Sequence, residues 1–228
     1  MLGDYGDVLA YTLGLAFIIA SIAVTLAWGF AYYCRFRVGR FGLGLVFVAL
    51  VTLFGGYLTK IYAWRIILGE GGILNSALMA LGIVTEPITA LLFNPAAVAI
   101  TLVHYLLPLA ILPIYGAMRG ISDAALEAAR DLGATPLRMA RDIVLPQSRL
   151  GLQIAFATSF FFAAGDYVAP TLVGGPSTSL IGTFIQSQFG HRLNVPMGAA
   201  MSLTVLVLSA AVVGLVAVLV MLATRVRR

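Results

Sequence analysis

The segment "EAARDLGATPLRMARDIVLP", residues 127–146, interrupts an otherwise apolar chain. It carries six charged side chains in twenty residues, whereas the whole 228-residue chain is 61% hydrophobic and only 10% charged. One glycine and two prolines punctuate the segment, and these residue types commonly mark the ends of helices. The segment is therefore predicted to be a polar, helical connection between long apolar segments.

Five apolar windows without an Asp, Glu, Lys or Arg lie on either side of this connection, at residues 8–34, 41–59, 87–118, 150–165 and 193–224. The mean hydropathy of the chain is +1.02, and about 20 apolar residues are enough to cross a bilayer as a helix. A membrane-spanning segment must satisfy its own backbone polar groups, and these windows are too long for barrel strands. We expect one all-α polytopic membrane domain over residues 1–228, with five transmembrane helices at about 8–33, 41–60, 92–118, 150–170 and 198–222.

The distribution of basic residues predicts the orientation of these helices, because cytoplasmic loops are enriched in Lys and Arg. Eleven of the 14 basic residues fall in three groups that alternate crossings place on one side: Arg35, Arg37 and Arg40; Arg119, Arg130, Arg138, Arg141 and Arg149; Arg225, Arg227 and Arg228. The N-terminus is then outside, and the C-terminus and the loop at 119–149 are cytoplasmic. This topology accounts for the net charge of +5 without a nucleic-acid partner. The single cysteine, Cys34, permits no internal disulfide and gives no metal-binding spacing.

Helix-capping signals occur twice within the cytoplasmic loop. Asp123 is a candidate N-cap for a first helix, and Gly133 stands where the left-handed residue after a helix is expected. Thr135 followed by Pro136 predicts a second N-cap, and Pro146 disfavours helix at the residue before it. Two short helices joined by a tight turn are therefore expected. An apolar side is formed by Ala125, Ala129, Leu132, Leu137, Ala140 and Ile143. Helices this short are unstable alone, so the loop is either a docking element or a solvated loop whose arginines set the topology.

The loop matches the pattern E-A-A-x3-G-x9-I-x-L-P without a gap, at Glu127, Ala128, Ala129, Gly133, Ile143, Leu145 and Pro146. It resembles the cytoplasmic loop of binding-protein-dependent ABC importer permeases, which have the MetI-like permease fold. The resemblance implies that this coupling loop, residues 119–149, forms a coupling helix that docks on a separate ATPase subunit. Residues 127–146 would then transmit nucleotide-driven motion to the membrane helices. Gly133 would supply the turn, and Glu127 a polar contact that anchors the loop or its partner.

Further stretches resemble the spermidine/putrescine-type permeases: "YAWRIILGEGGILN" (62–75), "LPLAILPIYGAMRGISDAALEAARDLGA" (107–134) and "GDYVAPTLVGGP" (165–176). This implies a polyamine substrate and, as partners, a second permease subunit, cytoplasmic ATPase subunits and a periplasmic solute-binding protein at a bacterial inner membrane. Opines, phosphonates and iron are the alternative substrates. Such permeases usually have six spans, and this chain begins just before the second, so it is either truncated or a five-span form.

The sequence contains no G-x4-G-K-[ST] phosphate loop, and its only lysine, Lys60, is expected outside. ATP hydrolysis is therefore expected on a partner subunit, and this chain is expected to be no enzyme and to hold no cofactor or metal. Gly175-Pro176-Ser177 with His191 superficially resembles a hydrolase nucleophile and base, but no third member accompanies them.

Asp166, Tyr167 and His104 are the candidates for the substrate path, because ionisable residues within membrane spans commonly mark a function. Asp166 and Tyr167 could present a carboxylate and an aromatic face to an organic cation. The alternative for Asp166 is an interfacial acid that bonds to the backbone, and for His104 a neutral, hydrogen-bonded side chain within the bundle. A self-sufficient secondary carrier is the competing class of function, and only His104 loosely fits its need for ion-coupling residues.

Overall fold

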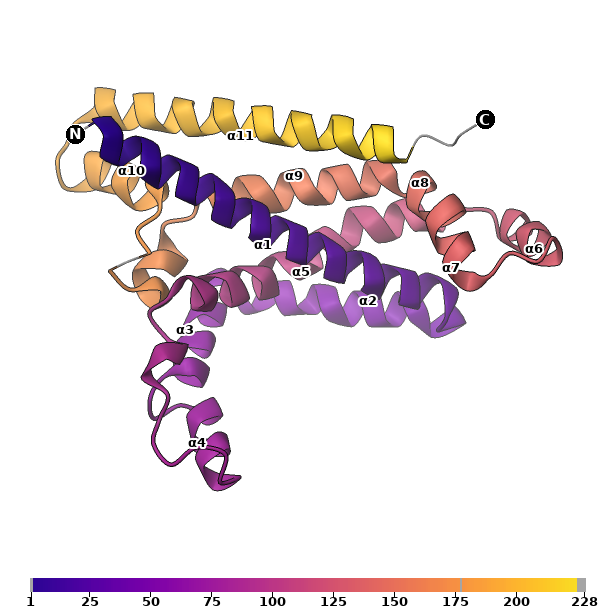
Figure 1. Ribbon diagram of the computed structural model, residues 1–228, viewed down its shortest axis with the longest axis horizontal. Helices are drawn as coiled ribbons and strands as arrows, with labels where there is room; N and C mark the ends of the chain where they lie inside the picture. The colour runs from indigo at the N-terminus through magenta and orange to yellow at the C-terminus, as the bar shows by residue number, and fades with distance from the viewer. Residues whose placement is uncertain (1, 177, 225–228) are drawn as a thin grey trace.

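The computed structural model describes residues 2–176 and 178–224, and over these the chain is built of helices without a strand. Ser177 and the C-terminal arginines Arg225, Arg227 and Arg228, which entered the hydrolase and orientation arguments, lie outside the described residues. The helices α1 (Leu2–Phe36), α2 (Gly42–Val51), α5 (Pro95–Arg119), α9 (Arg149–Gly165) and α11 (Val195–Ala223) run along the long axis of the molecule (Figure 1).

The core consists of α1, α5 and α9, each of which packs against the other two. Five alanines recur at spacings of three and four on α1, so they share one face, and all five are buried: Ala16, Ala20, Ala23, Ala27 and Ala31. Small side chains let helix backbones approach closely within a membrane. The helix α2 lies against α1 and α5, and α11 lies against α9 and the short helix α10 (Ile181–Gly190).

A glycine permits the closest approach between α5 and α9. A Cβ added to Gly151 on α9 would come within 2.5 Å of the Pro113 carbonyl oxygen and 3.0 Å of the Ile114 Cα atom on α5. Real Cβ atoms do not approach a backbone so closely, so only glycine fits at this crossing.

Among residues 2–176 and 178–224, three helical segments are long and apolar enough to cross a membrane: Tyr5–Phe36, Pro95–Arg119 and Val195–Ala223. The second apolar window is not one straight helix, because the chain bends by 90° between Gly39–Gly55 and Tyr57–Ala80. Gly56 lies at the bend with φ of 74°, a backbone conformation that favours glycine. The bent pair would make a fourth span, and α9 has 17 residues. The count of five crossings therefore stays a prediction.

Beyond the bend, α3 (Tyr57–Leu68) and α4 (Ile73–Ala80) project sideways from the bundle (Figure 1). Buried Asn75 fixes the return of the chain from this arm. Its Nδ2 donates to the carbonyl oxygens of Gly69 at 3.1 Å and Ile88 at 3.2 Å, and its Oδ1 accepts from the Ile88 N–H at 2.8 Å. The Asn75 side chain thus links the end of α3, the helix α4 and the segment at Ile88.

Candidate functional site

The loop that contains the E-A-A-x3-G-x9-I-x-L-P pattern folds into a helical elbow that extends past the end of α5 and α9 (Figure 1). We use the name coupling elbow for α6 (Asp123–Asp131), α7 (Pro136–Met139), a π-turn (Ala140–Val144) and α8 (Leu145–Gln147). The predicted pair of short helices is therefore present.

Gly133 forms the predicted turn between α6 and α7. Its φ is 79°, its N–H donates to the Arg130 carbonyl oxygen at 2.9 Å, and the Ala134 N–H donates to the Ala129 carbonyl oxygen at 2.9 Å. These two bonds make a Schellman motif, which satisfies carbonyl groups that the end of a helix leaves open. A left-handed residue is required at this point, and glycine adopts that conformation without strain.

The two predicted N-caps have different outcomes. Thr135 caps α7 as expected, since its Oγ1 accepts from the Arg138 N–H at 3.3 Å and Pro136 is the first helical residue. The prediction of Asp123 as the cap of α6 is wrong: Ser122 is the N-cap, and Asp123 is the first residue of the helix. The Asp123 carboxylate does not cap the helix but forms an ion pair with Arg35 at 2.7 Å.

The prediction that Pro146 ends the helix at Leu145 is also wrong. The Leu145 N–H donates to the Ala140 carbonyl oxygen, five residues back, and α8 continues through Pro146 to Gln147. A π-turn adds one residue to a helical turn. The chain has therefore already left the regular α-helical hydrogen-bond pattern when it reaches Pro146, which has no N–H to donate. The chain then reaches α9 (Arg149–Gly165) through a turn at Ser148, which separates the two helices.

The apolar side chains of the elbow separate into an inner and an outer set. Leu126, Met139 and Val144 are buried, and Leu126 and Val144 join a cluster with residues of α1 and α5, against which half-buried Ile143 also packs. At the tip, Leu132 is 89% and Leu137 is 78% exposed. Large apolar side chains exposed together on a polar segment are typical of a protein-interaction surface.

The remaining residues of the pattern flank this tip or lead away from it. Glu127 and Ala128 are exposed on α6, and Ala129 is half-buried. Leu145 and Pro146 are half-buried where the elbow joins the bundle. The pattern thus combines an exposed face on α6 with a partly covered root on α8.

Two polar contacts to α1 hold the elbow at its two ends. At the start, Arg35 Nη2 donates to the Ile121 carbonyl oxygen at 3.3 Å as well as to Asp123. At the finish, Trp28 Nε1 donates to Ser148 Oγ at 3.3 Å. The sequence placed Arg35 only as a topology signal, and nothing in it indicated either contact.

The three candidates for the substrate path do not form one site. Asp166 is 6% exposed, and its two carboxylate oxygens accept from the Val168 N–H at 3.2 Å and the Ala169 N–H at 3.1 Å. His104 is exposed on α5, and its Nδ1 accepts from Trp64 Nε1 at 3.0 Å. Trp64 and His104 line an apolar cavity of their own, whereas Tyr167 lines a larger groove between α9, α10 and α11.

Lys60, which the sequence placed on the outer side, has a buried side chain. It is 7% exposed, its Nζ lies 3.4 Å from Thr52 Oγ1 across the bend in the chain, and the same atom lies 5.6 Å from the centre of the Tyr105 ring. No carboxylate pairs with it within the described part of the chain. The bend, which composition does not reveal, is what turns Lys60 inward.

Comparisons with known proteins agree with this geometry. Residues 11–228 match the family "Binding-protein-dependent transport system inner membrane component". The "Spermidine/putrescine transport system permease protein PotB" of Escherichia coli K12 is 34% identical over 200 residues, which cover 88% of this chain and 72% of that protein. The "Inner membrane ABC transporter permease protein YdcU" of the same organism is 31% identical over 217 residues, covering 90% and 68%.

The fold has a counterpart among solved structures. A bacterial ABC transporter involved in the import of the acidic polysaccharide alginate superposes with a TM-score of 0.75 at 15% identity, over 96% of this chain and 79% of the other. This likeness shows the MetI-like permease fold alone, whereas the sequence matches show the family. The chain belongs to the inner membrane components of binding-protein-dependent transport systems.

Proposed function

We propose that this permease subunit of an ABC importer carries polyamines, and that the coupling elbow delivers the power stroke. The polyamine assignment is supported by the spermidine/putrescine permeases that are 32–34% identical over about nine-tenths of the chain. Opines, phosphonates and iron are the substrates that the test below must exclude.

The observation that carries the coupling role is the exposed tip of the elbow. Leu132 and Leu137 flank the turn at Gly133 and are left uncovered, while Leu126 and Val144 fix the same elbow to the bundle. A rigid body with an apolar tip and a buried root suits a joint between two proteins. A separate ATPase subunit would cover the tip, and its closure on ATP would push the elbow and the helices attached to it.

The rest of the assembly follows from the same role. ATP would bind to the partner ATPase, since no phosphate-loop pattern occurs in this sequence. A second permease subunit would complete the translocation path, and a periplasmic solute-binding protein would deliver the polyamine. A self-sufficient carrier would need none of these partners, and family membership favours the subunit.

The coupling role is tested by Gly133→Pro and Glu127→Arg in cells that express the whole importer. Proline cannot adopt a φ of 79°, so the turn must distort, and Glu127→Arg reverses the charge of the exposed α6 face. We expect ATP-dependent uptake to be lost while the amount of protein in the membrane stays normal. Gly82→Pro is the matched control, because Gly82 has φ of 68° and equally open surroundings but lies on the outer arm. Normal uptake in both elbow variants would refute the coupling role.

The substrate is tested by competition for uptake of labelled spermidine. Putrescine and unlabelled spermidine are expected to compete, whereas an opine, a phosphonate and chelated iron are not. Reconstitution distinguishes the carrier hypothesis, since a permease subunit alone in vesicles is expected to transport nothing.

A further inference from the structure

A cavity with a volume of about 640 Å³ lies between α9, α10 and α11. We call it the outer groove. Pockets of about 300–1,000 Å³ accommodate small organic ligands. The residues that matter here are its aromatic and polar side chains: Phe161, Tyr167, Gln186, Phe189, Ser202 and Ser209. None of the residues that line it carries a formal charge.

Ser209, at one end of the groove, has a hydroxyl group without a partner. The residue is 1% exposed, and its Oγ makes no hydrogen bond within the described structure. Other hydroxyls on α11 bond to the carbonyl four residues back: Ser202 to Gly198 at 2.9 Å and Thr204 to Ala200 at 2.8 Å. A buried hydroxyl without a partner is costly, so Ser209 is placed for a ligand that can donate or accept a hydrogen bond.

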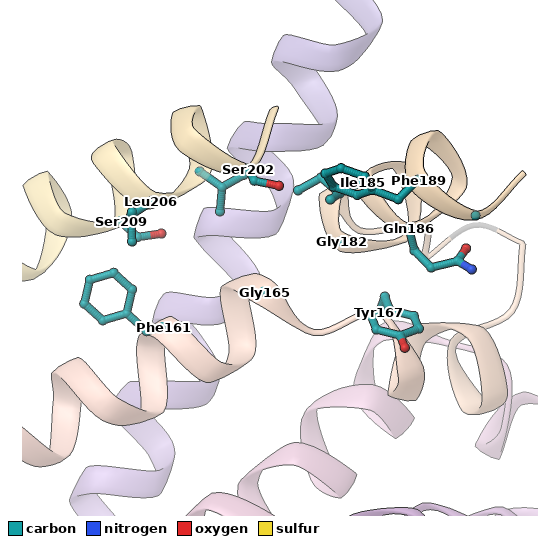
Figure 2. A pocket seen from close by; sticks show the side chains of 12 residues that line it. Phe161, Gly165, Tyr167, Gly182, Ile185, Gln186, Phe189, Ser202, Leu206 and Ser209 are labelled. Atoms are coloured by element: carbon teal, nitrogen blue, oxygen red, sulfur yellow. The ribbon is translucent and has the colours of Figure 1, made fainter. Parts of the chain in front are cut away.

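The two ends of the groove combine aromatic faces with oxygen acceptors. Figure 2 shows Phe161 beside Ser209 at one end, and Tyr167 near Gln186 at the other. The Ser202 hydroxyl donates its hydrogen bond to the Gly198 carbonyl oxygen, so the Ser202 oxygen remains available as an acceptor. Aromatic faces attract alkylammonium groups, and hydroxyl and amide oxygens accept their N–H bonds.

The neighbouring carboxylate does not take this part. Asp166 lies between the groove residues Gly165 and Tyr167 in the chain, but it is 6% exposed and does not line the groove. The groove therefore has to recognise its ligand through neutral groups.

We infer that the outer groove binds a linear aliphatic di- or polyamine, with one ammonium group at Phe161 and Ser209 and another at Tyr167 and Gln186. The methylene chain lies between them against Ile185 and Leu206, which are apolar. This inference rests on the proposed polyamine transport and assigns the residues that contact the substrate. A lipid chain would leave Ser209 without a partner, and a face of the second permease subunit would close the groove to water.

The test labels a cysteine in the groove of the assembled importer. Cys34, the native cysteine, is replaced by alanine, and Ser209→Cys is treated with a small, positively charged methanethiosulfonate reagent with and without spermidine. We expect reaction at Ser209→Cys and a several-fold slower reaction when spermidine is present. Ser159→Cys is the control, because Ser159 is another buried serine with an unpartnered hydroxyl but does not line the groove. It is expected to show no protection by spermidine.

The outcomes separate this inference from the proposed function. If wild-type importer takes up spermidine but Ser209→Cys fails to react, the groove is occupied by lipid or by the second permease subunit, and the inference is overturned. Reaction without protection overturns it as well. If wild-type importer takes up no polyamine at all, the proposed substrate is wrong. Tyr167→Ala and Phe161→Ala, made in the Ser209→Cys background, are each expected to weaken the protection, and unchanged protection in both would contradict the aromatic contacts.

Discussion

Arg35 Nη2 lies 2.7 Å from Asp123 Oδ1 and so joins the last turn of α1 to the first residue of α6. The two residues are 88 positions apart in the chain. Together with the bond from Trp28 to Ser148, this ion pair makes α1 the helix to which both ends of the coupling elbow are attached. We therefore expect a displacement of the elbow to move α1.

Loss of this ion pair is expected to impair coupling more than stability. The Arg35 side chain is 22% and the Asp123 side chain 69% exposed, and ion pairs this open to solvent contribute about 1 kcal/mol or less. We expect Arg35→Ala to reduce uptake per ATP hydrolysed while the melting temperature changes little. Arg37 is exposed two residues further along the chain and makes no ion pair with the described residues, so Arg37→Ala is the control. Equal effects of the two substitutions would show that only the net charge of this end matters.

Gly151→Ala is expected to destabilise the contact between α5 and α9. The added Cβ would meet the Pro113 carbonyl oxygen at 2.5 Å, and overpacking of this kind costs about 1–3 kcal/mol. The melting temperature of the purified protein in detergent should fall. Gly214→Ala on α11 is the control, since a Cβ there meets nothing within 4 Å. A stable Gly151→Ala protein would mean that the two helices can separate at no cost.

Lys60→Met is expected to stabilise the protein or leave its stability unchanged. A buried charge without a carboxylate partner is expensive to keep from water, and Met has a similar length and no charge. The bond to Thr52 Oγ1 is 3.4 Å long, close to the limit for a hydrogen bond, so its loss is a small term. The melting temperature of the variant shows whether removal of the buried charge outweighs loss of the bond to Thr52. A clear loss of stability would show that Thr52 and the Tyr105 ring outweigh the desolvation of the ammonium group.

His104→Gln is expected to retain most of the uptake. His104 Nδ1 accepts the Trp64 N–H, and the amide oxygen of glutamine can accept the same bond. His104→Leu removes the acceptor and should cost about 1 kcal/mol of stability. Uptake by both variants, measured with their amounts in the membrane, tests this. Complete loss of uptake in His104→Gln would restore His104 as an ion-coupling residue.

Local signals in the sequence predicted local structure well. The turn at Gly133 and the cap at Thr135 depend only on residues a few positions away, and both predictions were confirmed. Pro146 misled because its effect depends on whether the helix can absorb a missing N–H, and the preceding π-turn does so. The all-α membrane fold was predictable because apolar windows of sufficient length leave few alternatives.

Features that depend on distant residues could not be predicted. The choice between two roles for Asp166 needed the positions of the Val168 and Ala169 N–H groups. The burial of Lys60 needed the 90° bend of the chain, and the outer groove needed three helices that only the tertiary fold brings together.

The alanine face of α1 has a mechanical consequence. A 35-residue helix is about 50 Å long, and the side chains of Ala16, Ala20, Ala23, Ala27 and Ala31 have no rotamers to exchange. Side chains this small interlock less with neighbouring helices than large ones do, although Ile19 is buried in the same core. We therefore expect α1 to move as one stiff unit when the elbow is displaced. Movement at the cytoplasmic end of α1 would then reach its outer end without disruption of the packed core between the helices.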